Sequence, residues 1–111
     1  MTNTNTKEFM TKVQNTIVND FEWTQERILD QFKVFTNLYG NYAKAKELVM
    51  GGCFDCYYSQ VANTMAEWFN TTADGIWAYY KDNEQRLWEN YVHIMAKNIV
   101  CITEGKRVYI D

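Results

Sequence analysis

The chain has 111 residues, a formal net charge of −3, no proline and an aromatic fraction of 16%. This length suits one domain with one hydrophobic core, and no stretch approaches the ~18 apolar residues of a membrane span. The acidic balance disfavours nonspecific nucleic-acid binding, which needs several Lys or Arg on one face to displace counterions.

Two helices are predicted in the N-terminal part of the chain. The first follows a frayed start over 1–5 and is capped by Asn5. The second begins at Thr24 and ends before Gly40, because glycine suits the left-handed position after a helix. Residues 21–23 form either a kink or a continuation. The expected apolar faces are Phe9, Met10, Val13, Ile17 and Phe21, and then Ile28, Leu29, Phe32, Phe35 and Tyr39.

Two further helices are predicted in the middle of the chain. The third begins at Asn41 and is stopped by Gly51 and Gly52. The fourth is capped by Asp55 and is broken at 70–72. The expected apolar faces are Tyr42, Ala45, Leu48 and Val49, and then Tyr58, Val61, Ala62, Met65, Trp68 and Phe69.

The last two predicted helices differ in strength. A short fifth helix begins at Thr72 and is weakened by Gly75. The sixth, with the clearest pattern, opens at Asp82, where Gln85 completes a capping box. The expected apolar faces are Ile76, Trp77 and Tyr80, and then Trp88, Tyr91, Val92, Met95 and Ile99.

The C-terminal segment allows two structures. β-Branched and aromatic runs on both sides of 104–106 favour a short β-hairpin over 99–110, with Asn98 ending the helix. The alternative continues the helix to Glu104. The sequence therefore predicts a mostly α fold in a single domain over 1–111, a compact bundle of about five to six helices, with or without this hairpin.

Cys53 and Cys56 form the one motif that suggests chemistry. A zinc site would need two more soft ligands, and the remaining ones, His93 and Cys101, lie about 12 Å apart along a continuous last helix. A redox pair would need a βαβ context that is missing, and the acidic neighbour of Cys56 favours the neutral thiol. We therefore interpret the pair as small residues at a helix junction and expect neither a metal nor a cofactor.

No catalytic constellation is evident in the sequence. Ser59 is not part of a Gly-x-Ser-x-Gly elbow, and His93 falls beside an apolar stripe, as expected for a surface histidine. We therefore expect a protein without enzymatic activity. Since the three cysteines are odd in number and Met1 to Lys7 lacks an apolar signal region, we expect a cytoplasmic protein without a disulfide framework.

An acidic run is the first feature that suggests a partner-binding surface. It consists of Asp20, Glu22, Glu26 and Asp30, of which the last three would share one face of an unbroken helix. Such a run is either an ordinary solvated face or a patch that meets a basic groove on a partner and imitates phosphate spacing.

An aromatic surplus is the second such feature. Trp and Tyr dominate binding hot spots, so rings that the core does not enclose are candidate anchors. Stacking on single-stranded nucleic acid is disfavoured, because a basic groove is missing. The surplus comprises Trp77, Tyr79, Tyr80, Trp88 and Tyr91, of which Trp77, Tyr79 and Tyr80 join the acidic run as candidate partner-binding residues.

The chain as a whole is short, acidic, aromatic-rich and rich in Asn and Tyr, as in Asn-Leu-Tyr-Gly-Asn-Tyr over 37–42. In length and composition it resembles the small anti-defence proteins of phages and mobile elements, of which anti-CRISPR inhibitors are the best-known class. The resemblance implies a stoichiometric inhibitor, in the host cytoplasm, that occupies a nucleic-acid or substrate site of a host nuclease. The alternative is a structural or regulatory helical homo-oligomer, such as a homodimer, without inhibitory activity.

Overall fold

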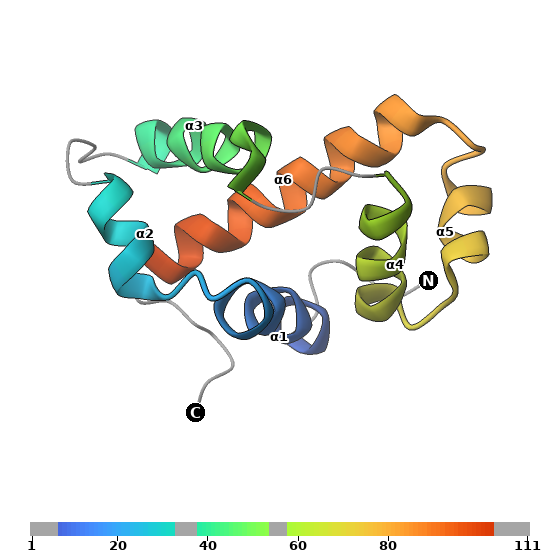
Figure 1. The fold of residues 1–111 in the computed structure, drawn as a ribbon, viewed down its shortest axis with the longest axis horizontal. Helices are drawn as coiled ribbons and strands as arrows, with labels where there is room; N and C mark the ends of the chain where they lie inside the picture. The colour runs from blue at the N-terminus through green and yellow to red at the C-terminus, as the bar shows by residue number, and fades with distance from the viewer. Residues whose placement is uncertain (1–6, 33–37, 54–57, 104–111) are drawn as a thin grey trace.

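The computed structural model of the protein describes residues 7–32, 38–53 and 58–103. Within these ranges the chain forms six α-helices and two π-helical turns and no strand (Figure 1). The helices are α1 (Lys7–Asn15), α2 (Gln25–Phe32), α3 (Leu38–Leu48), α4 (Tyr58–Phe69), α5 (Ala73–Tyr79) and α6 (Glu84–Thr103), and the π turns are η1 (Thr16–Asp20) and η2 (Val49–Cys53). The predicted mostly α bundle is therefore confirmed.

The long helix α6 runs through the centre of the fold (Figure 1). It has 20 residues and contacts α1, α2, α3, α4 and η2. Its buried side chains lie on more than one face, as expected of a helix that is covered on several sides. They are Leu87, Tyr91, Val92, Ile94, Met95, Ala96, Asn98, Ile99, Val100 and Ile102. The stripe predicted from the sequence is thus only part of the buried surface of α6.

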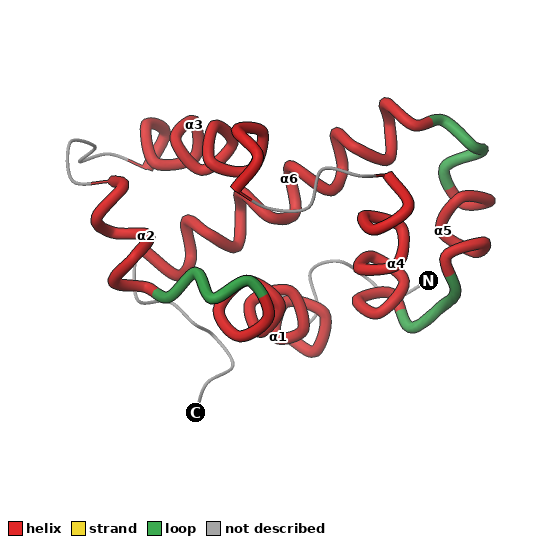
Figure 2. The backbone as a smooth tube through the Cα atoms, in the orientation of Figure 1, coloured by secondary structure: helices red, strands yellow, loops and turns green. Residues whose placement is uncertain are grey.

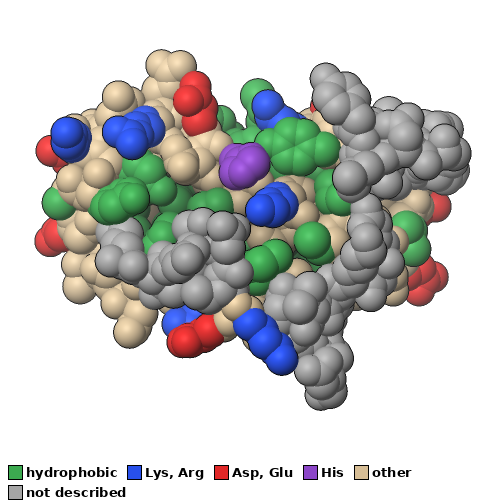
Figure 3. All heavy atoms as spheres, turned by 180° about the vertical axis from the view of Figure 1, so that it is seen from behind, with side chains coloured by type: hydrophobic (Ala, Val, Ile, Leu, Met, Phe, Trp, Pro, Cys, Tyr) green, Lys and Arg blue, Asp and Glu red, His purple; other side chains and the backbone are tan. Residues whose placement is uncertain are grey.

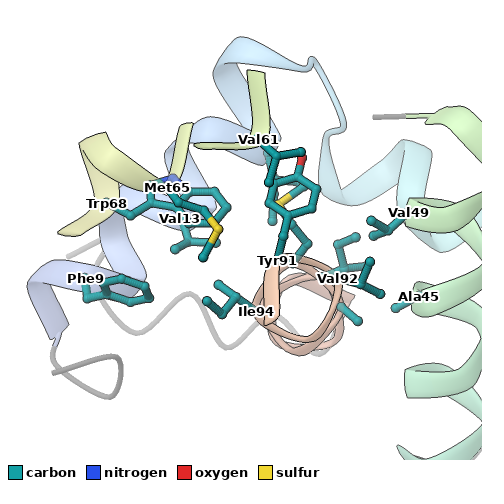
Figure 4. Close-up of a cluster of buried hydrophobic side chains, with 14 of the residues drawn as sticks. Phe9, Val13, Ala45, Val49, Val61, Met65, Trp68, Tyr91, Val92 and Ile94 are labelled. Atoms are coloured by element: carbon teal, nitrogen blue, oxygen red, sulfur yellow. The ribbon is translucent and has the colours of Figure 1, made fainter. Parts of the chain in front are cut away.

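Apolar side chains from α1, α3, η2 and α4 converge on α6 (Figure 4). Trp68 of α4 is 1% exposed. Its ring stacks on that of Tyr91 at a centroid distance of 5.8 Å and meets Phe9 edge-on at 6.3 Å. The predicted faces of the first and fourth helices are confirmed here for the side chains that the structure describes. They comprise the buried Phe9, Val13 and Ile17 of α1 and η1, and Val61, Ala62, Met65, Trp68 and Phe69 of α4.

Two polar contacts inside the core fix how α1 and η1 sit against α4 and α6. Trp68 Nε1 donates to Thr16 Oγ1 at 2.9 Å. Gln14 Nε2 donates to Asn98 Oδ1 at 3.1 Å, and Asn98 Nδ2 donates to the Ile94 carbonyl at 2.9 Å. Because a buried polar group that loses its partner is costly, these contacts favour one register of α1 on its neighbours.

The chain between η1 and α2 is a kink, which answers one question left open by the sequence. Glu22 has a φ of 61°, and residues 21–24 are not helical (Figure 2). Thr24 then begins α2 as predicted, since its Oγ1 accepts from the Arg27 N–H at 3.3 Å.

The break between α4 and α5 lies where it was predicted. Asn70 has a φ of 56°, and the Thr71 N–H donates back to the Ala66 carbonyl at 2.9 Å, which closes the end of α4. Thr72 caps α5, because its Oγ1 accepts from the Gly75 N–H at 3.0 Å.

The predicted start of the sixth helix was wrong by one residue. Asn83, not Asp82, is the cap of α6, because Asn83 Oδ1 accepts from the Arg86 N–H at 3.0 Å. Asp82, with a φ of 57°, instead closes α5, and its N–H donates to the Trp77 carbonyl at 2.8 Å. One Asx residue thus ends a helix and the next begins one.

The predicted boundary at Gly40 was also wrong. Helix α2 ends at Phe32, and α3 begins at Leu38 and runs through Gly40 and Asn41, so neither residue marks a helix end. The predicted stop at Gly51 and Gly52 was wrong as well, because α3 ends at Leu48 and η2 runs through both glycines. Glycine inside a helix costs about 1 kcal/mol, which the packing of α3 on α6 can offset. Leu29, expected in the core, is 43% exposed, whereas its neighbour Ile28 is buried.

The C-terminal hairpin is contradicted over its first half. Residues 99–103 continue α6, so the alternative of a longer helix holds there, and Asn98 lies inside the helix. The β-branched Ile99 and Ile102 are fully buried, which shows that packing outweighs their strand preference. The second half of the hairpin, the Asn5 and Asp55 caps, and Phe35 lie outside the described residues, as do the side chains of Phe32, Tyr39 and Tyr58.

No helix in the described part of the chain is both long enough and apolar enough to cross a bilayer.

The contact between Trp68 and Thr16 can be tested by a double-mutant cycle. Thr16→Val should lower the free energy of unfolding, because Trp68 Nε1 then stays buried without a partner. In a Trp68→Phe background the same change should cost about 1–3 kcal/mol less. Urea unfolding followed by circular dichroism measures both values. Equal costs in the two backgrounds would show that the hydrogen bond contributes nothing.

The assignment of the α6 cap gives a second test. Asn83→Ala should lower the free energy of unfolding by about 0.5–2 kcal/mol, because the Arg86 N–H loses its acceptor. Asp82→Gly should leave it unchanged or raise it, because glycine adopts a positive φ without strain. Thermal unfolding compares the two variants, and the reverse order would restore Asp82 as the cap.

Candidate partner-binding surfaces

The acidic run forms a corner at the junction of η1 and α2. Asp20 ends η1, Glu22 occupies the kink, and Glu26 and Asp30 lie on α2. All four side chains are exposed. The kink contradicts the unbroken helix on which their shared face depended, so only Glu26 and Asp30 keep the spacing of one helix face. We refer to these four residues as the acidic corner.

Trp23 anchors the acidic corner to the core. It is 6% exposed, and its backbone N–H donates to the Ile17 carbonyl at 2.9 Å. The Arg27 guanidinium lies 4.4 Å from the centroid of the Trp23 ring and also donates to the Glu22 carbonyl at 3.3 Å. Arg27, the cation nearest to the acidic corner in the sequence, thus contacts the Trp23 ring and the Glu22 carbonyl oxygen.

Among the residues that the structure describes, no carboxylate of the acidic corner forms an ion pair. The ion pairs found within the described ranges are Lys12–Glu8 and Lys44–Glu47, and neither involves the corner. Glu26 and Asp30 repel each other by a few tenths of a kcal/mol at this spacing. A basic surface of a partner would relieve this repulsion.

A shallow hollow lies within the acidic corner. It has a volume of about 530 Å³ and is lined by Thr24, Glu26, Arg27, Leu29 and Asp30. The exposed Leu29 gives it an apolar contact between two carboxylates. The hollow is open to solvent, which suits contact with a surface rather than enclosure of a small ligand.

The candidate aromatic residues divide between core and surface. Tyr80 is 3% exposed. Its pKa is raised to about 12, mainly by burial and secondly by the neighbouring Tyr79, although Arg86 acts to lower it. Tyr80 therefore belongs to the core, and its prediction as a contact residue was wrong. Tyr79 is 55% exposed and Trp77 is partly buried.

The acidic and aromatic candidates do not form one surface. Tyr79 and Trp77 lie on α5, at the opposite end of the molecule from α2 (Figure 1). The sequence could not show this, because the separation depends on how the helices pack. The acidic corner and the exposed part of α5 are thus separate surfaces.

The cysteines and the histidine are not assembled into a site within the described structure. His93 and Cys101 lie on one continuous helix, about 12 Å apart along its axis. Cys53 is in η2, with its side chain outside the described part, and Cys56 lies outside the described residues altogether. Among the residues that are described, no group of three His, Cys, Asp or Glu side chains could hold a metal ion.

A second hollow, which the sequence did not reveal, lies between α3 and α6. It has a volume of about 230 Å³, and Met50 at its edge is 60% exposed. The lining residues follow one another at four-residue spacing along α3 and η2 and along α6, but only the packing shows that the two rows face each other. We call it the α3–α6 groove, and it is lined by Tyr42, Lys46, Met50, Trp88, Glu89, Val92 and His93.

Comparison of the chain with models of protein families, with curated proteins and with solved structures finds no match. No role can therefore be transferred to a residue of this chain from a relative. The candidate surfaces rest on the exposure, charge and contacts of the residues that form them.

Proposed function

We propose that the chain is a non-enzymatic binding protein that blocks a basic surface of a partner protein with its acidic corner. The observation that carries the proposal is the set of exposed carboxylates beside Leu29, next to which the Arg27 guanidinium contacts the Trp23 ring and the Glu22 carbonyl. Such a corner favours a partner rich in Lys and Arg.

The class of partner follows from charge and from the resemblance noted in the sequence. A cluster of carboxylates can take the place of phosphates on a surface that binds nucleic acid, and its field speeds association with that surface. A nuclease of a host defence system has such a surface. The proposed activity is therefore stoichiometric inhibition of a defence nuclease, as in anti-CRISPR proteins.

The anchoring of the acidic corner supports the same proposal. Trp23 is buried and ties the kink to the core, so the carboxylates are carried by a segment that is already ordered before binding. Pre-ordered contacts lose less conformational entropy on association, which improves affinity without additional contacts.

The double variant Glu22→Lys with Glu26→Lys tests the proposal. The tagged wild-type chain is first used to capture its partner from host lysate, and that purified partner is then the probe. We expect the variant to bind it at least about tenfold more weakly, with an increased dissociation constant at low salt, because like charges now oppose each other. Surface plasmon resonance at two salt concentrations measures this effect.

The double variant Glu67→Lys with Glu84→Lys is the matched control, because it changes the net charge equally at exposed positions outside the corner and leaves both ion pairs intact. It should bind the partner nearly as the wild type does. Full binding and inhibition by the Glu22→Lys, Glu26→Lys variant, with the fold intact by circular dichroism, would show that the acidic corner is not the contact surface. Capture of a partner with no nucleic-acid or substrate site would refute the nuclease assignment.

A further inference from the structure

The α3–α6 groove is held at one end by a contact between its two walls. Tyr42 Oη lies 2.7 Å from His93 Nδ1, and the two rings meet edge-on at a centroid distance of 5.9 Å. Figure 3 shows the histidine on the back face, with hydrophobic and basic side chains next to it. This contact fixes the spacing of the two helices where the groove begins.

The apolar part of the groove combines one fixed side chain and, at its edge, one adaptable side chain. Trp88 is partly buried, and its ring stacks on the fully buried Tyr91 at 5.7 Å, which holds its exposed part in place. Met50 is 60% exposed, and a methionine side chain adjusts readily to the shape of what it contacts. Such a combination is typical of sites that receive a side chain of another protein.

The size of the groove limits what can enter it. Its volume of about 230 Å³ lies below the range of about 300–1,000 Å³ in which drug-sized ligands are usually bound. One inserted side chain, with its backbone outside the groove, is a better match than a cofactor.

Basic groups lie at the end of the groove marked by His93. Lys46 lines the groove, and its ammonium is 5.9 Å from the centroid of the Tyr42 ring. Lys97 follows His93 by one helical turn, and both lysines are exposed. Neither takes part in an ion pair with any residue that the structure describes.

His93 offers a hydrogen-bond donor to the groove when its Nδ1 accepts from Tyr42 Oη, because the ring proton is then on Nε2. The one acid in the groove, Glu89, lies a turn before His93, and its Oε1 accepts from Gln85 Nε2 at 3.0 Å. Lys46 and Lys97 together outnumber Glu89 at this end, which favours a negatively charged group near Lys46 and His93.

We propose that the α3–α6 groove binds a short acidic segment of a partner protein. One apolar side chain of that segment enters between Met50 and Trp88, and a neighbouring carboxylate meets Lys46 and His93. The groove would then select a partner of opposite charge to the one that the acidic corner selects. The proposal does not depend on the function proposed for that corner.

Titration of the ¹⁵N-labelled full chain with three synthetic peptides tests the proposal. The peptides are acetyl-Glu-Asp-Leu-Phe-Glu-Asp-amide, a version with Lys in place of each acid, and a version with Ser in place of Leu and Phe. We expect only the first to cause saturable amide shifts, confined to 42–50 and 88–97. The acidic charge and the apolar side chain are both needed for this result.

Variants of the groove separate the two contributions. Lys46→Glu should weaken binding of the acidic peptide at least about fivefold and strengthen binding of the Lys peptide. Met50→Ser should weaken binding of the acidic peptide without reversing the charge preference. Lys44→Glu, with the same charge change on the same helix but outside the groove lining, should leave binding of the acidic peptide unchanged.

Several outcomes would overturn the proposal. These are the absence of saturable shifts at the groove, an equal response to the three peptides, or unchanged binding by Lys46→Glu. Shifts of the same groove residues that grow with protein concentration alone, and disappear in Met50→Ser, would assign the groove to a second copy of the chain and likewise overturn it.

Discussion

The burial of α6 on several sides is the constraint on which the rest of the structure depends. A helix with buried residues as widely distributed as Leu87, Ile94 and Ile102 cannot be covered by one neighbour. Helices α1, α3 and α4 therefore each turn their apolar side chains toward it, and Trp68 and Tyr91 stack where α4 meets α6. The candidate binding surfaces lie where the surrounding helices end or leave a gap.

The two candidate surfaces follow from this arrangement. The acidic corner lies where η1 gives way to α2, and Trp23 ties that kink to the core. The α3–α6 groove is the gap left beside the central helix where Tyr42 meets His93. One surface presents carboxylates and the other presents lysines beside apolar groups. The two candidate surfaces therefore differ in charge.

The sequence predicted the helices and several of their ends because those signals are local. Thr24 and Thr72 accept from the N–H three residues later, as their residue type and position predicted. The failures arose where tertiary packing overrode a local preference. Gly40 is inside α3 because α3 packs on α6, and the β-branched residues around Ile99 stay helical because they are buried.

The sequence predicted that the acidic run is exposed, but not how its residues are arranged or which aromatic side chains reach the surface. The exposure of the acidic run follows from its charge. The positive φ of Glu22, however, breaks the shared face, and nothing in the sequence predicts a positive φ at a glutamate. Tyr79 and Tyr80 are adjacent aromatics of one helix end, and only packing decides that Tyr80 is the buried one. The α3–α6 groove was missed because it exists only between two helices far apart in the sequence.

Native-state hydrogen exchange tests most directly whether α6 is the element on which the fold depends. Amides from Tyr91 to Ile102 should exchange only through global unfolding, with an opening free energy equal to that of the whole domain, whereas amides of α2 should open at lower free energy. If the amides of α6 exchange through local opening at a free energy no higher than those of α2, the central role of α6 is wrong.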